Sequence, residues 1–256
     1  MKGPVRAKKH LGQHFLRNEN VAKAIVEGLP ASVDDAVVIE VGPGDGVLSK
    51  YLLARYSNVR LFDVDEESIQ YLKRQFPMHV DQIYLQDFLS YDLSGPHRII
   101  GNFPYNISSQ IVFKILDHRD DVSGMVGMFQ KEVAQRIASK EGSKVYGILS
   151  VLTQLYFEVE YLFDVEALNF DPPPKVVSGV IRMTKKKDVT IECDEKQLFS
   201  LVKRSFNQRR KMLRKSLKDL IPEQVPEDLV PFLTLRPEQL SPNDFITLTR
   251  ALAPSK

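Results

Sequence analysis

The sequence AVVIEVGPGDG, at residues 36–46, determines the fold that we expect for this chain. Its first six residues are mostly branched and apolar, and they predict a buried strand that ends at the glycines. Glycine lets the backbone turn tightly and approach a ligand that a Cβ atom would block. Residues 47–55 then predict a helix. A strand, a glycine-rich loop and a helix in this order are typical of nucleotide-binding sites in doubly wound folds.

The spacing of the glycines indicates which class of nucleotide-binding site this is. The dinucleotide fingerprint G-x-G-x-x-G requires a glycine at position 47, where this chain has Val47. The pattern present is Glu40-x-Gly42-x-Gly44-x-Gly46, which resembles that of S-adenosylmethionine-dependent methyltransferases. The alternative is an ordinary glycine-rich turn that binds nothing.

Short β-branched runs alternate with longer helical patterns through residues 20–183. Further strands are predicted at 59–64, 82–85, 98–101, 122–129 and 176–183. Helices are predicted at 21–26, 66–75 and 107–116. Strands that alternate with helices imply a parallel sheet with right-handed crossovers. We therefore expect an α/β, Rossmann-like methyltransferase domain.

A polar connection at 184–188 separates this pattern from a different one. Apolar residues then recur at near-helical spacing, and five prolines divide the remaining chain into short helices. We place a domain boundary near residue 185. The prediction is a methyltransferase domain at 1–185, with a basic N-terminal arm, and a small all-helical RNA-binding domain at 186–256.

Composition excludes several classes of protein. The 256 residues are 43% apolar and 27% charged, which excludes a disordered, collagen-like or coiled-coil chain. The single cysteine, Cys193, excludes an internal disulfide framework and fits a reducing compartment. No run of about 18 apolar residues occurs, and no apolar segment follows the basic N-terminus. We expect no membrane span and no secretory signal, and we place the protein in the cytoplasm.

The net charge of +2 is unevenly distributed. Residues 1–18 carry five cations and no acid: Lys2, Arg6, Lys8, Lys9 and Arg17. Residues 196–218 carry nine cations and no acid: Lys196, Lys203, Arg204, Arg209, Arg210, Lys211, Arg214, Lys215 and Lys218. A solvated helix face usually mixes charges of both signs. The two basic segments therefore favour binding of a polyanion such as RNA over the alternative of a merely solvated face.

Two acidic residues follow predicted strands that neighbour the glycine loop. Asp63 lies at the end of the second strand, where a doubly wound sheet places a carboxylate against a ribose. Asp87 follows the third strand and is suited to accept a hydrogen bond from the amino group of adenine. Either acid alone would be an ordinary surface residue or helix cap. Together with the loop they predict a nucleoside site.

The motif NFPYNIS, at residues 102–108, follows the fourth strand and predicts the chemistry. The amine of adenine is a poor nucleophile, because its lone pair is delocalised into the ring. The side-chain oxygen of Asn102 and a nearby backbone carbonyl can hold both amine hydrogens and draw the nitrogen toward tetrahedral geometry. Pro104 fixes the turn that presents the carbonyl, and Tyr105 offers a flat face on which a base can stack. We therefore predict N6 methylation of adenine.

Several segments resemble the KsgA (RsmA) family of small-subunit rRNA adenine N6-dimethyltransferases. The matches are Gly12–Leu16, the glycine loop, Asn102–Ser108, Gln130–Val133, Phe170–Ser178 and Phe206–Lys211. The resemblance implies cofactor contacts at six positions: His14, Leu16, Gly42, Asp63, Asp87 and Asn102. It also implies that Phe170 and Tyr105 sandwich the target base. Many relatives carry Asn where His14 stands, and an imidazole can still donate or accept a hydrogen bond.

The resemblance also implies a substrate and partners. These are two adjacent adenosines in a hairpin loop near the 3′ end of small-subunit (16S) rRNA, methylated in free rRNA or in a pre-30S particle, with a role in small-subunit biogenesis. We expect a monomer. We also expect no bound metal, since His10 and His14 have no third ligand at suitable spacing. Two alternatives stay open. One is a large-subunit rRNA adenine methyltransferase of the macrolide-resistance type, and the other is a non-catalytic assembly factor.

Overall fold

The structure is a computed structural model that describes residues 5–30, 36–187, 189–227 and 229–252. Lys2, one of the cations of the basic N-terminal arm, lies outside these residues. Contacts within the chain divide it into two compact units: residues 1–135 with 157–185, and residues 136–156 with 186–256. This division shares the break after residue 185 with the predicted domains, but it assigns 136–156 to the second unit. A methyltransferase domain at 1–185 and an RNA-binding domain at 186–256 stay a prediction.

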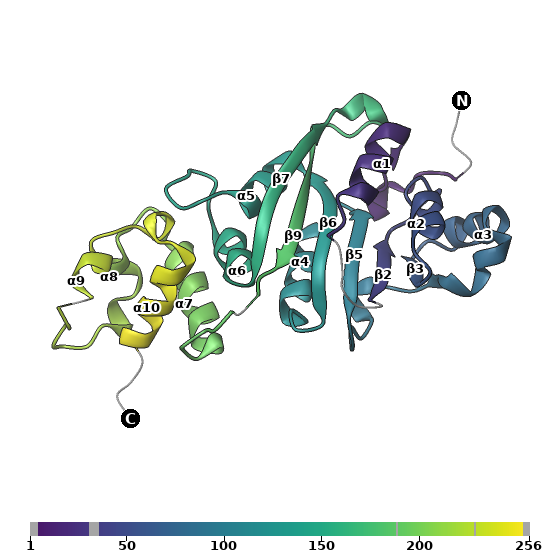
Figure 1. The fold of residues 1–256 in the computed structure, drawn as a ribbon. Helices are drawn as coiled ribbons and strands as arrows, with labels where there is room; N and C mark the ends of the chain where they lie inside the picture. The colour runs from purple at the N-terminus through teal and green to yellow at the C-terminus, as the bar shows by residue number, and fades with distance from the viewer. Residues whose placement is uncertain (1–4, 31–35, 188, 228, 253–256) are drawn as a thin grey trace. The chain divides into compact units, whose positions relative to one another are not determined.

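The first unit is built on a seven-stranded sheet with the strand order β4-β3-β2-β5-β6-β9-β7 (Figure 1). Its strands are β2 (Val37–Val41), β3 (Val59–Asp63), β4 (Ile83–Leu85), β5 (His97–Asn102), β6 (Val122–Gln130), β7 (Phe157–Val165) and β9 (Ser178–Lys185). The five strands from β4 to β6 are parallel. This mostly parallel sheet with its helices confirms the expected α/β, Rossmann-like fold.

The last two strands of the sheet differ from the expectation of an entirely parallel sheet. β9 pairs antiparallel with both β6 and β7. β7 was not among the predicted strands, although its first half alternates apolar residues with glutamates (FEVEY). Residues 166–177, which join β7 to β9, contain no crossover helix, so the chain returns antiparallel.

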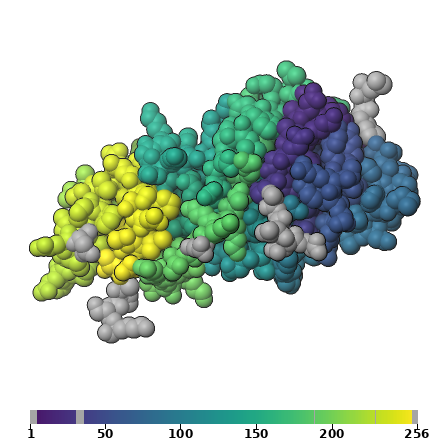
Figure 2. Space-filling view, viewed as in Figure 1, coloured from purple at the N-terminus to yellow at the C-terminus, as the bar shows by residue number. Residues whose placement is uncertain are grey.

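The longer helices of the first unit are α1 (Glu19–Glu27), α2 (Ser49–Arg55), α3 (Glu66–Gln75), α4 (Ser108–Asp117) and α5 (Lys131–Ala138), the last of which crosses the division between the units. Of these helices, α1 and α3 begin at capping side chains, whereas α2 and α4 begin without one. Asn18 accepts hydrogen bonds from two amides at the start of α1, and Asp65 accepts one at the start of α3. Figure 2 shows the purple N-terminal part of the chain, which includes α1, lying against the dark-blue part that includes α2.

Short elements complete the first unit. They are the strands β1 (Phe15–Leu16) and β8 (Phe170–Asp171) and the 3-10 turns η1 (Lys9–Leu11), η2 (Pro77–Gln82), η3 (Phe88–Ser90) and η4 (Ala167–Asn169). β1 and β8 form a two-stranded antiparallel sheet, with Leu16 opposite Phe170. This sheet ties the N-terminal residues to the connection between β7 and β9.

The second unit is helical. Its elements are α6 (Ile148–Tyr156), α7 (Glu195–Asn207), α8 (Leu213–Ser216), η5 (Lys218–Leu220), α9 (Val230–Leu233), η6 (Pro237–Gln239) and α10 (Pro242–Ala251). Phe206 packs between two other rings, with centroid distances of 6.1 Å to Tyr146 and 6.0 Å to Phe245. No helix in the described part of the chain has the length and apolar character needed to cross a membrane.

Candidate cofactor and catalytic site

A cavity of about 230 Å³ lies at the carboxyl ends of β2, β3 and β5. Three segments form most of its wall: residues 11–16, the glycine loop and residues 102–107. Ligands of open parallel sheets bind at this edge of the sheet. Seven of the predicted site residues line the cavity, namely His14, Leu16, Gly42, Asp63, Asp87, Asn102 and Tyr105. The structure thus brings together residues that lie as far apart in the sequence as His14 and Tyr105. The individual roles of these seven residues stay predictions.

The glycine loop needs glycine for two reasons. Gly42 has a φ of 71° and Gly44 a φ of 56°, in the left-handed region that disfavours other residues. A Cβ atom on Gly44 would also lie 2.7 Å from the ring of Phe15, which packs on the loop. The amide of Gly44 donates to Oδ2 of Asp63 at 3.1 Å. The loop is therefore fixed against both the N-terminal residues and β3.

Asp63 ends β3 with its carboxylate held by backbone donors. Its Oδ2 accepts from Gly44, and its Oδ1 accepts from the amide of Asp65 at 2.9 Å. The residue is 7% exposed, and this burial raises the pKa of Asp63 to about 6 despite these hydrogen bonds. The carboxylate is thus oriented before any ligand binds.

Asp87 lies two residues beyond β4 and lines the cavity from an exposed position. One carboxylate oxygen, Oδ1, caps η3 by accepting from the amide of Leu89 at 2.9 Å. That contact fixes the side chain and leaves the second oxygen as an acceptor for a ligand.

Asn102 is held so that its amide nitrogen faces protein. Nδ2 donates to the backbone oxygen of His14 at 2.8 Å, which leaves Oδ1 as the acceptor. The segment is positioned by the neighbouring Phe103, whose ring is 1% exposed and packs at 5.1 Å on Phe129. A Cβ atom at Gly127 would lie 2.2 Å from that ring, so only glycine leaves room for it.

Tyr105 stands beside Asn102 with its ring partly buried. Its hydroxyl lies 2.6 Å from Oγ of Ser178 in β9, and burial raises the pKa of Tyr105. The ring of His14 stacks on Tyr105 at a centroid distance of 5.6 Å and an interplanar angle of 29°. Nδ1 of His14 also lies 2.8 Å from the carbonyl oxygen of Pro172. His14 therefore contacts Asn102 through its backbone and Tyr105 through its ring.

Residues 5–235 match the family described as ribosomal RNA adenine dimethylase. The chain belongs to this family. It is an rRNA adenine dimethyltransferase that uses S-adenosylmethionine, as the glycine loop and the motif at 102–105 predicted.

Two relatives in this family illustrate the similarity. The protein named ribosomal RNA small subunit methyltransferase A in Flavobacterium johnsoniae is 52% identical, and the match covers 97% of this chain and 96% of that one. The protein of the same name in Porphyromonas gingivalis strain W83 is 50% identical, with 97% and 98% covered.

Two solved structures share the fold. A dimethyladenosine transferase from Plasmodium falciparum has a TM-score of 0.79 at 24% identity, covering 92% of this chain and 96% of that one. The 23S rRNA methyltransferase ErmE has a TM-score of 0.71 at 25% identity, covering 93% and 99%.

The cavity of this adenine dimethylase fits a nucleoside cofactor. Its glycine loop offers close backbone approach, and two carboxylates at successive strand ends can accept hydrogen bonds from ribose hydroxyls and an adenine amine. When bound, S-adenosylmethionine supplies a methyl group that its sulfonium already activates. Gly42, Asp63 and Asp87 are the residues that would hold it.

Glu40 begins the glycine pattern, but the sequence assigned it no role in the site. It is 1% exposed, lines the cavity, and accepts a hydrogen bond from Oγ of Ser49 at 2.7 Å. Burial, together with the nearby Asp63 and Asp45, raises the pKa of Glu40 to about 8. The position of Glu40 at the start of the glycine pattern was the one feature of the sequence that could have placed it at the cavity.

Phe170 does not line the cavity. It is 4% exposed and belongs to the same buried apolar cluster as Leu16, its partner across β1 and β8. Leu16 is itself 1% exposed, so its buried side chain serves the core while the residue borders the cavity. Stacking of a target base on Phe170 stays a prediction that requires this side chain to become accessible.

A second cavity, of about 460 Å³, also borders His14 and Tyr105. It shares Gly12, Gln13, His14 and Tyr105 with the first cavity and is lined further by Ala7, Lys9, Gln130 and residues 172–176. The two cavities therefore meet at the rings that the sequence assigned to cofactor and base. In the described part of the chain, no cluster of three or more His, Cys, Asp or Glu side chains could hold a metal.

Among the described residues of the basic N-terminal arm, some cations form ion pairs with acidic residues of the protein, and others do not. In the N-terminal arm Lys8 pairs with Asp65 and Arg17 pairs with Asp45, whereas Lys9 is exposed beside the second cavity. Both acidic partners are buried or nearly so. Lys8 and Arg17 thus have structural contacts that sequence charge alone did not reveal.

Proposed function

We propose that this dimethylase transfers methyl groups to N6 of two adjacent adenosines in a hairpin loop near the 3′ end of small-subunit rRNA. The product is N6,N6-dimethyladenosine, formed as part of small-subunit biogenesis. The observation that carries the chemistry is the contact between Nδ2 of Asn102 and His14, because it leaves Oδ1 to accept from an adenine amine. The names of the relatives about half identical to this chain support the choice of rRNA.

Asn102 and a backbone carbonyl act as the pair of acceptors. The carbonyl of Pro104 already accepts from the amide of Ile107 at 3.1 Å, so we assign the second acceptor to the carbonyl of Phe103. In the first transfer the two acceptors hold both hydrogens of the amine and expose its lone pair, and the nitrogen releases one proton to solvent at each methylation. Since the methyl group is already activated, positioning supplies most of the catalysis and no strong base is needed.

Tyr105 binds the target base by stacking. Its hydroxyl contact with Ser178 fixes the ring at the boundary between the two cavities. A base taken out of its helix enters through the second cavity, where Lys9 and Lys175 place positive charge for the RNA backbone. The ring of His14 moves off Tyr105 to admit the base, and Phe170 becomes the opposite face of the sandwich.

The two alternatives are weaker. ErmE, which is named as a 23S rRNA methyltransferase, is 25% identical to this chain, against 46–52% for relatives named as small-subunit enzymes. A non-catalytic assembly factor would have no use for the oriented amide of Asn102 beside Tyr105. An assembly role can accompany catalysis.

The proposal extends to the oligomeric state of the enzyme, its cellular compartment and the form of its rRNA substrate. The enzyme acts as a monomer in the cytoplasm, on rRNA held in a pre-30S particle, because a folded particle presents the RNA shape that basic segments recognise. Residues 196–218 of the helical second unit supply nine of the fourteen cations in the two basic segments.

The test uses labelled S-adenosylmethionine with small and large ribosomal subunits from a strain that lacks this activity. We expect label in small-subunit rRNA, with pre-30S particles accepting more than free rRNA. Label confined to large-subunit rRNA would promote the first alternative, and no label in either would promote the second.

A further inference from the structure

Residues 5–14, which we call the strap, form one wall of the cofactor cavity. Leu11, Gly12, Gln13 and His14 line the cavity directly. At one end of the strap, Val5 is 3% exposed, and at the other end Asn102 donates to the backbone of His14. The strap has few contacts of regular secondary structure, since only η1 and its turn hydrogen bonds lie within it. Side-chain contacts must therefore hold it over the cavity.

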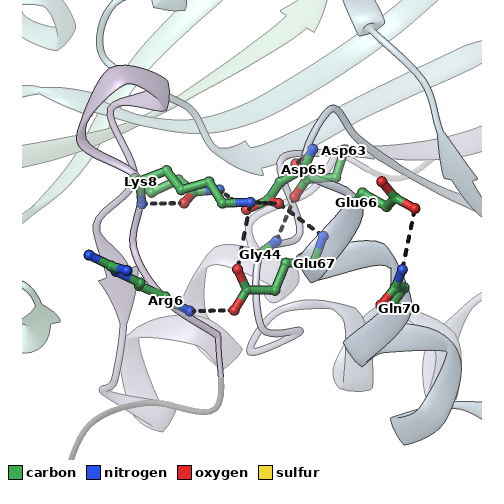
Figure 3. Close-up of polar contacts among 9 residues, drawn as sticks. Arg6, Lys8, Gly44, Asp63, Asp65, Glu66, Glu67 and Gln70 are labelled. Atoms are coloured by element: carbon green, nitrogen blue, oxygen red, sulfur yellow. Dashed lines mark hydrogen bonds and ion pairs between the residues drawn. The ribbon is translucent and has the colours of Figure 1, made fainter.

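Asp65, the N-cap of α3, makes the central contact with the strap (Figure 3). Its side chain has no exposed surface, and it forms an ion pair with Nζ of Lys8. Its Oδ2 accepts from Nε2 of Gln13 at 3.0 Å, and its Oδ1 accepts from the amide of Glu67 at 3.0 Å. One buried carboxylate thus joins two strap residues to the first turn of a helix.

Further contacts brace the same region. The backbone amide of Lys8 donates to Oε1 of Gln13 at 2.8 Å, which closes the strap on itself. The amide of Arg6 donates to Oε1 of Glu67 at 3.1 Å, and Nζ of Lys8 lies 3.6 Å from Oε2 of Glu67 (Figure 3). The arrangement pins the strap at several points to α3.

Asp65 is charged and lies next to the cofactor-binding acid. Burial alone would raise the pKa of Asp65, but hydrogen bonds from Lys8 and Gln13 outweigh burial and hold this pKa below its usual value. The amide of Asp65 donates to Oδ1 of Asp63 at 2.9 Å. Asp65 itself does not line the cavity. Its backbone therefore orients Asp63 while its side chain holds the opposite wall.

We propose that Asp65 is a positioning residue, whose buried carboxylate latches the strap over the cofactor cavity and slows release of S-adenosylmethionine. The inference rests on binding of that cofactor in this cavity, as in the proposed function. Opening the strap would break the ion pair with Lys8 and leave a buried carboxylate without its cation, which is costly. The latch therefore favours the closed wall, and cofactor exchange requires it to open.

The test compares Asp65→Asn with Glu66→Gln. Asparagine caps helices as well as aspartate, so the first variant keeps the cap of α3 through its one carboxamide oxygen, and it loses both the charge and the acceptor for Nε2 of Gln13. Glu66 is the adjacent residue, exposed, and contacts Gln70 at 3.3 Å, so its variant is a matched control (Figure 3). By calorimetry and stopped flow we expect Asp65→Asn to raise the Kd for S-adenosylmethionine about tenfold, mainly through faster release. The control should leave both unchanged.

Three further readouts separate latching from a general structural role. For Asp65→Asn we expect KM for S-adenosylmethionine to rise much more than kcat falls, and hydrogen exchange at residues 6–13 to accelerate without a matching loss of thermal stability. Lys8→Met should reproduce these effects, Lys8→Arg should not, and Lys8→Met with Asp65→Asn should be less than additive.

Distinct results would overturn the inference. An unchanged release rate in Asp65→Asn, or additive effects of the two substitutions, would mean that Asp65 does not latch the strap, while the proposed function stands. A wild-type protein that binds no S-adenosylmethionine would overturn both.

Discussion

Asn102 and Tyr105 are fixed by partners within the first unit, whereas most cations of residues 196–218 are exposed side chains of the second unit. The difference reflects what each segment must recognise. A methyl transfer depends on the position of one nitrogen atom, so its residues need a rigid setting. A phosphate backbone is recognised by charge, which tolerates mobile side chains. Substitutions in the two regions should therefore fail in different ways.

Two cations within the basic segment do not follow that contrast. Arg209 is half-buried and donates to the backbone oxygens of Ser143 and Lys144, and Arg204 pairs with Asp219 at 2.5 Å. Both contacts lie within the second unit. These arginines have a structural role, whereas Arg210 and Arg214 are exposed.

The largest effect is expected at Asn102. Asn102→Ala removes the side-chain acceptor for the adenine amine, so kcat should fall by about 10²–10³-fold, as when one preorganised hydrogen-bonding group is removed from another active site. The Kd for S-adenosylmethionine should change much less. Single-turnover methylation measures the rate, and calorimetry measures the Kd. A wild-type rate of methylation by Asn102→Ala would contradict the role assigned to Asn102.

A smaller effect is expected from residues 196–218. Substitutions there should separate the exposed arginines from the arginines with a structural role. Arg210→Glu with Arg214→Glu should weaken RNA binding and reduce its log–log salt slope by roughly 0.7–0.9 for each phosphate that the protein no longer neutralises. Arg209→Ala should instead cost about 1–2 kcal/mol of unfolding free energy, because two backbone oxygens lose their donor. Filter binding across salt concentrations and thermal unfolding distinguish them. An identical salt slope in the double variant would make the segment a solvated surface.

At Tyr105 the contribution of the ring can be separated from that of the hydroxyl. Tyr105→Phe keeps the stacking face and removes the hydrogen bond with Ser178, so turnover should fall only a few-fold, the cost of one net hydrogen bond. The turnover of Tyr105→Ala should fall much further, since base stacking contributes about 1–3 kcal/mol. Equal reductions in both variants would show that the hydroxyl, not the ring, matters.

The smallest effect concerns Glu40, a buried acid that lines the cofactor cavity. The pKa of Glu40 is raised to about 8 from 4.5, so the folded protein holds this proton where the unfolded chain releases it. Its contribution to unfolding free energy therefore declines as pH rises from about 4.5 to 8. Glu40→Gln mimics the protonated acid, so the variant should gain stability relative to wild type at pH 8 and not at pH 4. A constant difference across that range would contradict the raised pKa.

Prediction from sequence was most successful where chemistry leaves a local pattern. The glycine loop, Asp63 and residues 102–105 are short motifs at strand ends, and a parallel sheet brings such ends together. The antiparallel pairing of β7 and β9 was missed, because pairing depends on the path of residues 166–177 rather than on strand composition. The burial of Phe170 and the contacts of Lys8 and Arg17 were also missed, since they depend on which distant residues meet.

In the proposed function, the oriented amide of Asn102 directs complete dimethylation of two adjacent adenosines. The most direct measurement is mass spectrometry of nuclease-digested small-subunit rRNA after exhaustive reaction of an unmethylated particle with the wild-type enzyme and with Asn102→Ala. We predict up to four methyl groups with wild type, two on each of two neighbouring adenosines, and almost none with the variant. Methyl groups at scattered adenosines, adenosines that stop at one methyl group, or full dimethylation by Asn102→Ala would contradict this account.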